Sequence, residues 1–157
     1  EPLLQGDIEE FLRKVRELEY AIKLDTNGSF PEKLESIIEN GLCDYVAMDI
    51  KNSKEKYPET VGIKNFDIRD IEKSVEILKR GNVPFEFRTT VTKNFHTIID
   101  IENIGMWIKG TENYYLQNFV DSGNLIDSNV EGVSKEAMQE MLEAVKKYVP
   151  NADIRGL

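Results

Sequence analysis

Helical and strand-like patterns alternate along the whole chain, and this alternation restricts the fold more than any other sequence feature. Apolar residues spaced three and four apart predict amphipathic helices at residues 7–19, 31–40, 67–80, 97–108 and 134–145. Short runs rich in β-branched and aromatic residues predict strands at residues 20–24, 44–50, 85–91, 114–119 and 152–155. Strands that alternate with helices form parallel βα units. We therefore expect a single α/β domain over residues 1–157, either a doubly wound sheet or part of a (β/α) barrel.

Residues typical of helix ends support these boundaries. Asp7 and Ser134 are expected to cap the first and last helices, and Thr97 followed by Asp100 predicts a capping box. Pro31 suits the first turn of a helix. The first helix is expected to bury one stripe of apolar residues: Ile8, Phe11, Leu12, Val15 and Leu18.

Charge and cysteine content exclude several functional classes. The net charge is −9, from 29 acidic and 20 basic residues, so the basic surface of a nucleic-acid binder is not expected. No apolar run approaches the roughly 20 residues of a membrane span, so no membrane partner is expected and a cytoplasmic location is predicted. Cys43 is the one cysteine and His96 the one histidine. An internal disulfide, a three-thiolate cluster site and a multi-histidine metal site are therefore excluded.

Polar side chains follow the predicted strands at the point where each strand ends. The first strand is followed by Asp25-Thr26-Asn27-Gly28 and the second by Asp49-Ile50-Lys51. Arg88 lies in the third strand, and Gln117 and Asn118 lie in the fourth. The carboxyl ends of parallel strands share one edge, where binding and reactive groups of βα proteins gather. Together these groups predict a polar site of mixed charge, suited to a small zwitterionic ligand.

Each of these residues also has a purely structural interpretation. The segment 25–28 is a good turn sequence, and the amides of Gln117 and Asn118 can bond loop backbone. Asp49 and Lys51 lie two residues apart, so on a strand they would share a face, either as an ion pair or as part of a site. His96 is interpreted as structural or solvent-exposed, and Cys43 as a small buried hydrophobe.

Five motifs in order resemble the radical S-adenosylmethionine activating enzymes of glycyl radical enzymes. They are Glu1-Pro2 as the end of a Gly-Gly-Glu-Pro motif, Asp25-Thr26-Asn27-Gly28, Met48-Asp49-Ile50-Lys51, residues 57–62, and Arg88-Thr89-Thr90-Val91. The resemblance covers essentially the whole chain. It is greatest to the activating proteins of anaerobic ribonucleoside-triphosphate reductase, and the pyruvate formate-lyase activating enzymes are near relatives. It implies a partial (β/α) barrel of four or five mostly parallel strands.

The resemblance also implies roles for individual residues. Glu1 and Pro2 would hold the methionyl amino group of S-adenosylmethionine, and Asn27 would line the same side of the site. Asp25, Thr26 and Asp49 would line the methionine side and help to hold a monovalent cation. Lys51 would contact the carboxylate of S-adenosylmethionine, with Arg88 close to the ligand. Gln117 or Asn118 stands near the place of a histidine in relatives, a place that Phe119 takes here.

The chain departs from the family in lacking the Cys-x-x-x-Cys-x-x-Cys motif that holds a [4Fe–4S] cluster. Because the sequence begins Glu1-Pro2 without an initiator methionine, we expect a fragment that lies after that motif and is inactive alone. The full-length parent would cleave S-adenosylmethionine reductively to form a glycyl radical on a partner enzyme, with flavodoxin or ferredoxin as electron donor.

Two other interpretations stay open at this stage. The chain could belong to a radical S-adenosylmethionine enzyme that modifies a small molecule or nucleoside, or be a non-catalytic βα binding module. In addition, a missing amino-terminal part would leave the first strand's edge unpaired, so either self-association or a poorly ordered amino-terminal end is expected.

Overall fold

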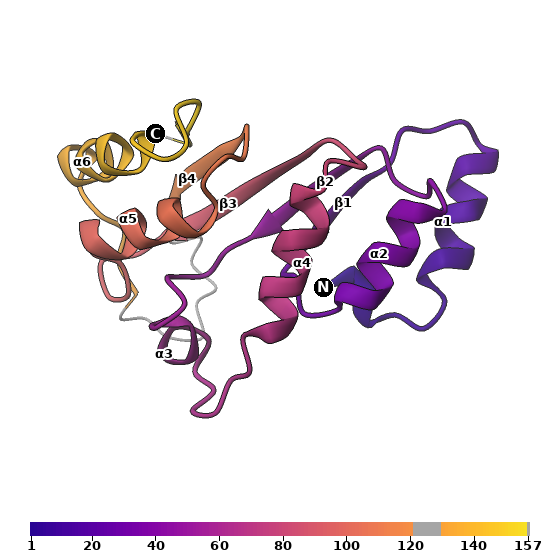
Figure 1. Ribbon diagram of the computed structural model, residues 1–157, viewed down its shortest axis with the longest axis horizontal. Helices are drawn as coiled ribbons and strands as arrows, with labels where there is room; N and C mark the ends of the chain where they lie inside the picture. Colours follow the sequence, from indigo (N-terminus) through magenta and orange to yellow (C-terminus); the bar gives the residue numbers. More distant parts are fainter. Residues whose placement is uncertain (121–129, 157) are drawn as a thin grey trace. The chain divides into compact units, whose positions relative to one another are not determined.

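The computed structural model describes residues 1–120 and 130–156, and they fall into two compact units (Figure 1). The amino-terminal unit contains Glu1–Asp49 and Asp67–Glu86, and the carboxy-terminal unit contains Ile50–Phe66 and Phe87–Leu157. The prediction of a single domain over the whole chain stays a prediction. No helix in the described part of the chain is long and apolar enough to cross a membrane.

The strands of the described residues form one sheet in the order β1-β2-β3-β4-β5. Their bounds are β1 Lys23–Thr26, β2 Tyr45–Asp49, β3 Phe85–Val91, β4 Tyr114–Asn118 and β5 Asp153–Arg155. In the amino-terminal unit β1 pairs in parallel with β2. In the carboxy-terminal unit β4 pairs in parallel with both β3 and β5. Sequential parallel strands with helical crossovers confirm the predicted α/β class.

Helices follow the strands as the apolar periodicity predicts. The α-helices are α1 Ile8–Glu17, α2 Pro31–Glu39, α3 Tyr57–Val61, α4 Arg69–Lys79, α5 Ile98–Trp107 and α6 Lys135–Lys146, and a 3-10 helix η1 spans Pro2–Leu4. Within the amino-terminal unit α2 packs against α4, and within the carboxy-terminal unit α5 packs against α6. Thr97 and Ser134 cap α5 and α6 through their side chains, as expected.

The first βα segment differs from the sequence prediction. The strand was expected at 20–24, but β1 begins at Lys23 and includes Asp25 and Thr26. Ile22, just before the strand, is held by the start of β2: its N–H donates to the Asp44 carboxylate at 2.7 Å, and its carbonyl accepts from the Asp44 and Tyr45 N–H groups at 2.8 and 3.3 Å.

Three further differences concern helices. Asp7 precedes α1 but makes no side-chain cap hydrogen bond. Phe11 and Leu18 are 59% and 68% exposed, so the buried stripe of α1 is narrower than its spacing suggests. α3 was not predicted, because a helix of this length shows no periodicity.

Candidate functional site

The predicted residues of the amino-terminal unit divide between the two faces of its strands. Asp25 pairs in register with Ala47, and Asp49 lies two residues further along β2. Residues paired in register on neighbouring parallel strands point to the same face, and side chains along one strand alternate between the two faces. Asp25 and Asp49 therefore lie on the same face. Thr26 pairs with Met48 on the opposite face and is buried. The structure therefore brings two of the three candidate cation ligands to one face of the sheet and sets Thr26 on the other.

Glu1 is held against the end of β1 by its own carboxylate. Its two oxygens accept hydrogen bonds from the Thr26 hydroxyl at 3.0 and 3.1 Å, and one accepts from the Asn27 N–H at 2.6 Å. The Leu3 N–H donates to the same carboxylate at 3.0 Å. Pro2 begins the adjoining 3-10 helix. Glu1, Thr26 and Asn27 are thus brought together, and the carboxylate's contacts tie η1 to the strand end.

Close packing under Gly28 fixes the turn that follows β1. Gly28 has a φ of +80°, and a Cβ there would lie 2.2 Å from the Met48 Cε. Its carbonyl accepts a hydrogen bond from the buried Ser74 hydroxyl of α4 at 2.7 Å. Only glycine meets both the positive φ and the lack of space without strain, so the turn interpretation holds for Asn27 and Gly28, whereas Asp25 and Thr26 belong to β1.

Arg88 and Gln117 share one face of the sheet in the carboxy-terminal unit. Thr90 pairs with Gln117, and Arg88 lies two residues before Thr90 on the same face. Both side chains are half-buried. Asn118 points the other way: its amide donates to the Val133 carbonyl at 2.8 Å and accepts from the Val133 N–H at 3.0 Å. Of the two amides proposed to lie near the ligand, the Gln117 amide lies on the same face as Arg88, and the Asn118 amide is bonded to loop backbone.

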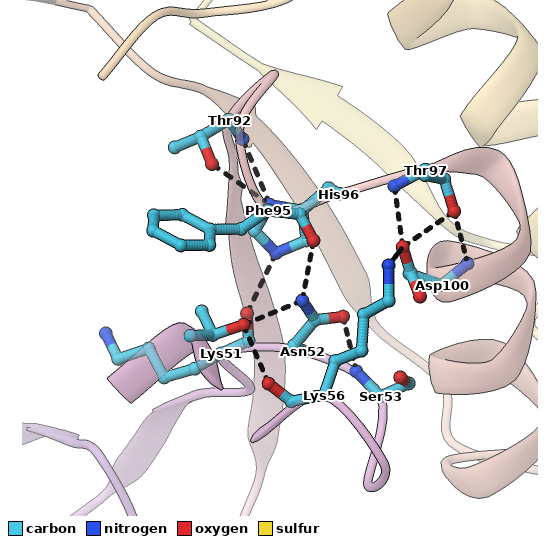
Figure 2. A network of polar contacts seen from close by, with 10 residues as sticks. Lys51, Asn52, Ser53, Lys56, Thr92, Phe95, His96, Thr97 and Asp100 are labelled. Carbon is cyan, nitrogen blue, oxygen red and sulfur yellow. Dashed lines mark hydrogen bonds and ion pairs between the residues drawn. The ribbon is translucent and has the colours of Figure 1, made fainter. Parts of the chain in front are cut away.

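Lys51 lies just after the end of β2, outside the strand, so the face-sharing argument made for Asp49 and Lys51 does not apply. Its backbone is held at both ends. The Lys51 N–H donates to the Tyr57 hydroxyl at 3.2 Å. The Lys51 carbonyl lies 2.8 Å from the His96 Nε2 (Figure 2). Tyr57 is buried and stacks on Phe66 with ring centroids 5.5 Å apart.

His96 is buried, at 5% exposure, which confirms the structural alternative and excludes the solvent-exposed one. Its Nδ1 accepts a hydrogen bond from the Thr92 N–H at 3.1 Å. Burial lowers the pKa of His96, and the backbone hydrogen bonds to Lys51 and Thr92 oppose this shift only in part. The ring is therefore neutral at pH 7, with its hydrogen on Nε2.

Asn52 and Asp100 complete the surroundings of Lys51 (Figure 2). The fully buried Asn52 amide donates to the Thr60 hydroxyl and the Phe95 carbonyl, each at 2.8 Å. The Asp100 carboxylate accepts from the Thr97 N–H at 2.8 Å and from Lys56 Nζ at 3.0 Å. Sequence reasoning did not select Asn52 or Lys56, because single polar residues in a loop carry no periodic signal. Tyr57 was part of the motif at residues 57–62 but was given no role of its own.

The residues present suit S-adenosylmethionine but not an iron–sulfur cluster. Within the amino-terminal unit Asp25 and Asp49 can bind an amino group, and within the carboxy-terminal unit Lys51 and Arg88 can bind a carboxylate. Cys43, the one thiol, is buried, and burial raises its pKa to about 11, so it is a poor thiolate ligand. The described residues contain no group of three or more metal-ligating side chains of His, Cys, Asp or Glu.

Comparisons with known proteins identify the family of the chain. Residues 1–109 match the family model described as the Radical SAM superfamily. A Methanocaldococcus jannaschii protein, provisionally named a glycyl-radical enzyme activating enzyme, is 34% identical over all of this chain and 68% of its own length.

Two solved structures share the fold. A domain of pyruvate-formate lyase-activating enzyme from Bacteroides vulgatus superposes with a TM-score of 0.74 at 15% identity, covering 99% of this chain and 94% of that one. A radical SAM methyltransferase from Sphaerobacter thermophilus superposes with a TM-score of 0.71 at 10% identity, covering 88% of this chain and 42% of that one. The fold is therefore the open, parallel partial (β/α) barrel that the sequence resemblance implied.

The sheet is open and parallel, and its strands end in polar residues. The family model matches most of the chain, and together these observations define the class of protein. The chain belongs to the Radical SAM superfamily.

Proposed function

We propose that this chain carries S-adenosylmethionine-binding residues of an activase that forms a glycyl radical on a partner enzyme. The observation that carries the proposal is that polar side chains at the strand ends share a face within each unit. Asp25 and Asp49 share a face in one unit, and Arg88 and Gln117 share a face in the other. The name of the M. jannaschii relative supports the activase class.

The residues divide the proposed binding work by charge. Within the amino-terminal unit Asp25 and Asp49 would attract an amino group or a monovalent cation, and within the carboxy-terminal unit Lys51 and Arg88 would bind a carboxylate. Glu1, Pro2, Thr26 and Asn27 would shape the adjacent strand end, because the Glu1 carboxylate already accepts hydrogen bonds from Thr26 and Asn27. Gln117 would offer an amide beside Arg88.

Radical SAM proteins use a [4Fe–4S] cluster to supply the electron that splits S-adenosylmethionine, and the residues of this chain do not provide that cluster. For the full-length parent protein, the proposal includes the cluster and an electron donor such as flavodoxin or ferredoxin. It also includes a glycyl radical enzyme, such as anaerobic ribonucleotide reductase, as the partner. Inactivity of the isolated chain and a cytoplasmic location also belong to the proposal.

The test uses the complete gene product that contains this chain, prepared without oxygen and supplied with iron, sulfide and dithionite. We expect formation of 5′-deoxyadenosine and methionine from S-adenosylmethionine. Lys51→Met should raise the KM for S-adenosylmethionine on the order of tenfold, as expected for loss of one charged hydrogen bond. Lys64→Met, which changes an exposed lysine of the same unit, is the matched control. Absence of cleavage by the unaltered protein would overturn the proposal.

A further inference from the structure

The backbone that carries Lys51 is fixed at every polar group from Ile50 to the Lys51 carbonyl. The Ile50 N–H donates to the Arg88 carbonyl at 2.8 Å, and the Ile50 carbonyl accepts from the Thr89 hydroxyl at 2.8 Å. The Lys51 N–H is held by Tyr57, and the Lys51 carbonyl is held by His96. Ile50, Thr89, Tyr57 and His96 are buried, so these hydrogen bonds satisfy polar groups that water does not reach, and they fix the course of the backbone that carries Lys51.

Resting on the proposed function of Lys51 as a ligand of S-adenosylmethionine, we infer that His96 is a positioning residue, whose Nε2–H fixes the Lys51 carbonyl and thereby aims the Lys51 side chain. The contact joins two segments far apart in sequence, the loop after β2 and the loop after β3 (Figure 2). His96 thus acts through Lys51 and touches no ligand itself.

The hydrogen bonds of the ring define one protonation state for this role. Nδ1 accepts from the Thr92 N–H, so Nε2 carries the hydrogen that the Lys51 carbonyl accepts. The Thr92 hydroxyl also lies 3.3 Å from Nδ1. The charged groups that act on the ring are Asp100 of α5 and Lys56, which precedes α3, and they oppose each other. The ring can therefore serve as a neutral donor and acceptor at once.

Asn52 supports the same geometry from the next residue. Its side-chain nitrogen Nδ2 donates to the Phe95 carbonyl, one residue before His96. Its side-chain oxygen Oδ1 accepts from the Ser53 N–H at 2.7 Å. The Lys51 loop and the His96 loop are therefore joined by two adjacent contacts. A substitution that removes only the His96–Lys51 contact should leave the Asn52 contact in place, and the loop should still fold.

Two variants of His96 distinguish an effect on the orientation of the Lys51 side chain from an effect on the folding of the loop. In His96→Gln the amide nitrogen lies as many bonds from Cα as the His96 Nε2, so it can donate to the Lys51 carbonyl. In His96→Asn the amide oxygen replaces Nδ1 as the acceptor for Thr92, but no donor reaches Lys51. Each variant thus keeps one hydrogen bond of the ring and loses the other.

The experiment measures equilibrium binding of S-adenosylmethionine and its cleavage kinetics with the complete gene product. We expect His96→Asn to weaken binding and raise KM about tenfold with kcat changed less than about threefold, and His96→Gln to restore binding to within about threefold of the unaltered protein. Equal loss in both variants, at equal unfolding free energies, would overturn the inference, as would unchanged binding in His96→Asn.

Lys51→Met distinguishes failure of the inference from failure of the proposed function. If Lys51→Met weakens binding and His96→Asn does not, His96 has no positioning role and the assignment of Lys51 survives. If Lys51→Met binds as well as the unaltered protein, the assignment of Lys51 fails and the inference fails with it. Nitrogen NMR of the imidazole supplies a readout independent of ligand: hydrogen on Nδ1 at pH 7 would contradict the proposed donor.

Discussion

At the scale of single residues, buried polar groups do most to define this chain's proposed site. His96 and Asn52 are nearly or fully buried, yet each has hydrogen-bond partners for its ring or amide groups. A buried polar group left without partners costs on the order of 1–3 kcal/mol, so these contacts also define the geometry of the loops that they join. The backbone conformation of Lys51 and its neighbours is fixed by such contacts.

Stability should depend on pH through His96. Burial lowers its pKa in the folded chain below the ordinary value of 6.5, so in the unfolded chain the ring takes up a proton first as the pH falls. The unfolding free energy should therefore be at its full value above about pH 6.5 and decrease as the pH falls toward the folded-state pKa. Denaturant unfolding at several pH values between 7 and 5 measures this slope.

His96→Gln removes the titrating ring and is the control for this pH dependence. Its unfolding free energy should change less over the same range than that of the unaltered chain. Burial raises the pKa of the nearby Asp100 carboxyl, but hydrogen bonds from Thr97 and Lys56 outweigh it and hold the pKa below its ordinary 3.8, so Asp100 stays ionised over this range. An equal slope in both proteins would assign the pH dependence to other groups.

At the scale of elements, the capping box at the start of α5 links helix formation to the site. The Thr97 hydroxyl accepts from the Asp100 N–H, and the Asp100 carboxylate accepts from the Thr97 N–H. Lys56 in the loop after β2 donates to the same carboxylate. The helix start therefore also helps to hold the segment that follows Lys51.

Thr97→Ala should lower the unfolding free energy by about 1 kcal/mol, because it leaves the Asp100 N–H without its cap. Thr97→Ser keeps the hydroxyl and should stay within about 0.5 kcal/mol of the unaltered chain. Chemical denaturation of both variants measures the difference. Equal stability of the two variants would mean that the capping hydroxyl contributes nothing measurable.

Most elements could be predicted from the sequence because their signals are local. β3 has the predicted bounds, and the capping signals at Thr97 and Ser134 mark the real starts of α5 and α6. The start of β1 could not be predicted, because its register depends on pairing with β2 and on the Asp44 contact to Ile22, which lie far along the chain.

The candidate site was predictable in residue type more than in arrangement. Strand ends identified Asp25, Asp49, Arg88 and Gln117, and strand alternation places them on shared faces within their units. That Thr26 lies on the opposite face follows from the true bounds of β1, which the sequence did not indicate. The contacts of His96 and Tyr57 with Lys51 depend on loop conformations that leave no pattern in sequence.

At the scale of the whole molecule, apolar side chains remain exposed in the amino-terminal unit. Leu4, Phe11, Leu18 and Tyr20 are each more than half exposed, and β1 lies at the end of the strand order. Phe11 also lines a groove with Ile8, Leu12 and Val15 of α1. Exposed apolar surface beside a terminal strand favours association.

We expect the chain of residues 1–157 to associate with a second copy through this surface. Light scattering should give a mass above 18.1 kDa, and Phe11→Lys should shift the population toward the monomer. Ile99→Lys, which changes an equally exposed apolar residue of the other unit, is the control and should leave the mass unchanged. A monomer at all concentrations would contradict the expectation.

The central claim is that the parent protein forms a glycyl radical on a partner enzyme. Its most direct measurement is electron paramagnetic resonance of the complete gene product incubated anaerobically with S-adenosylmethionine, a reductant and, in turn, each glycyl radical enzyme encoded in the same genome. The account predicts a glycyl radical on one of these enzymes, formed together with 5′-deoxyadenosine. Cleavage of S-adenosylmethionine without a glycyl radical on any of them would contradict the activase assignment.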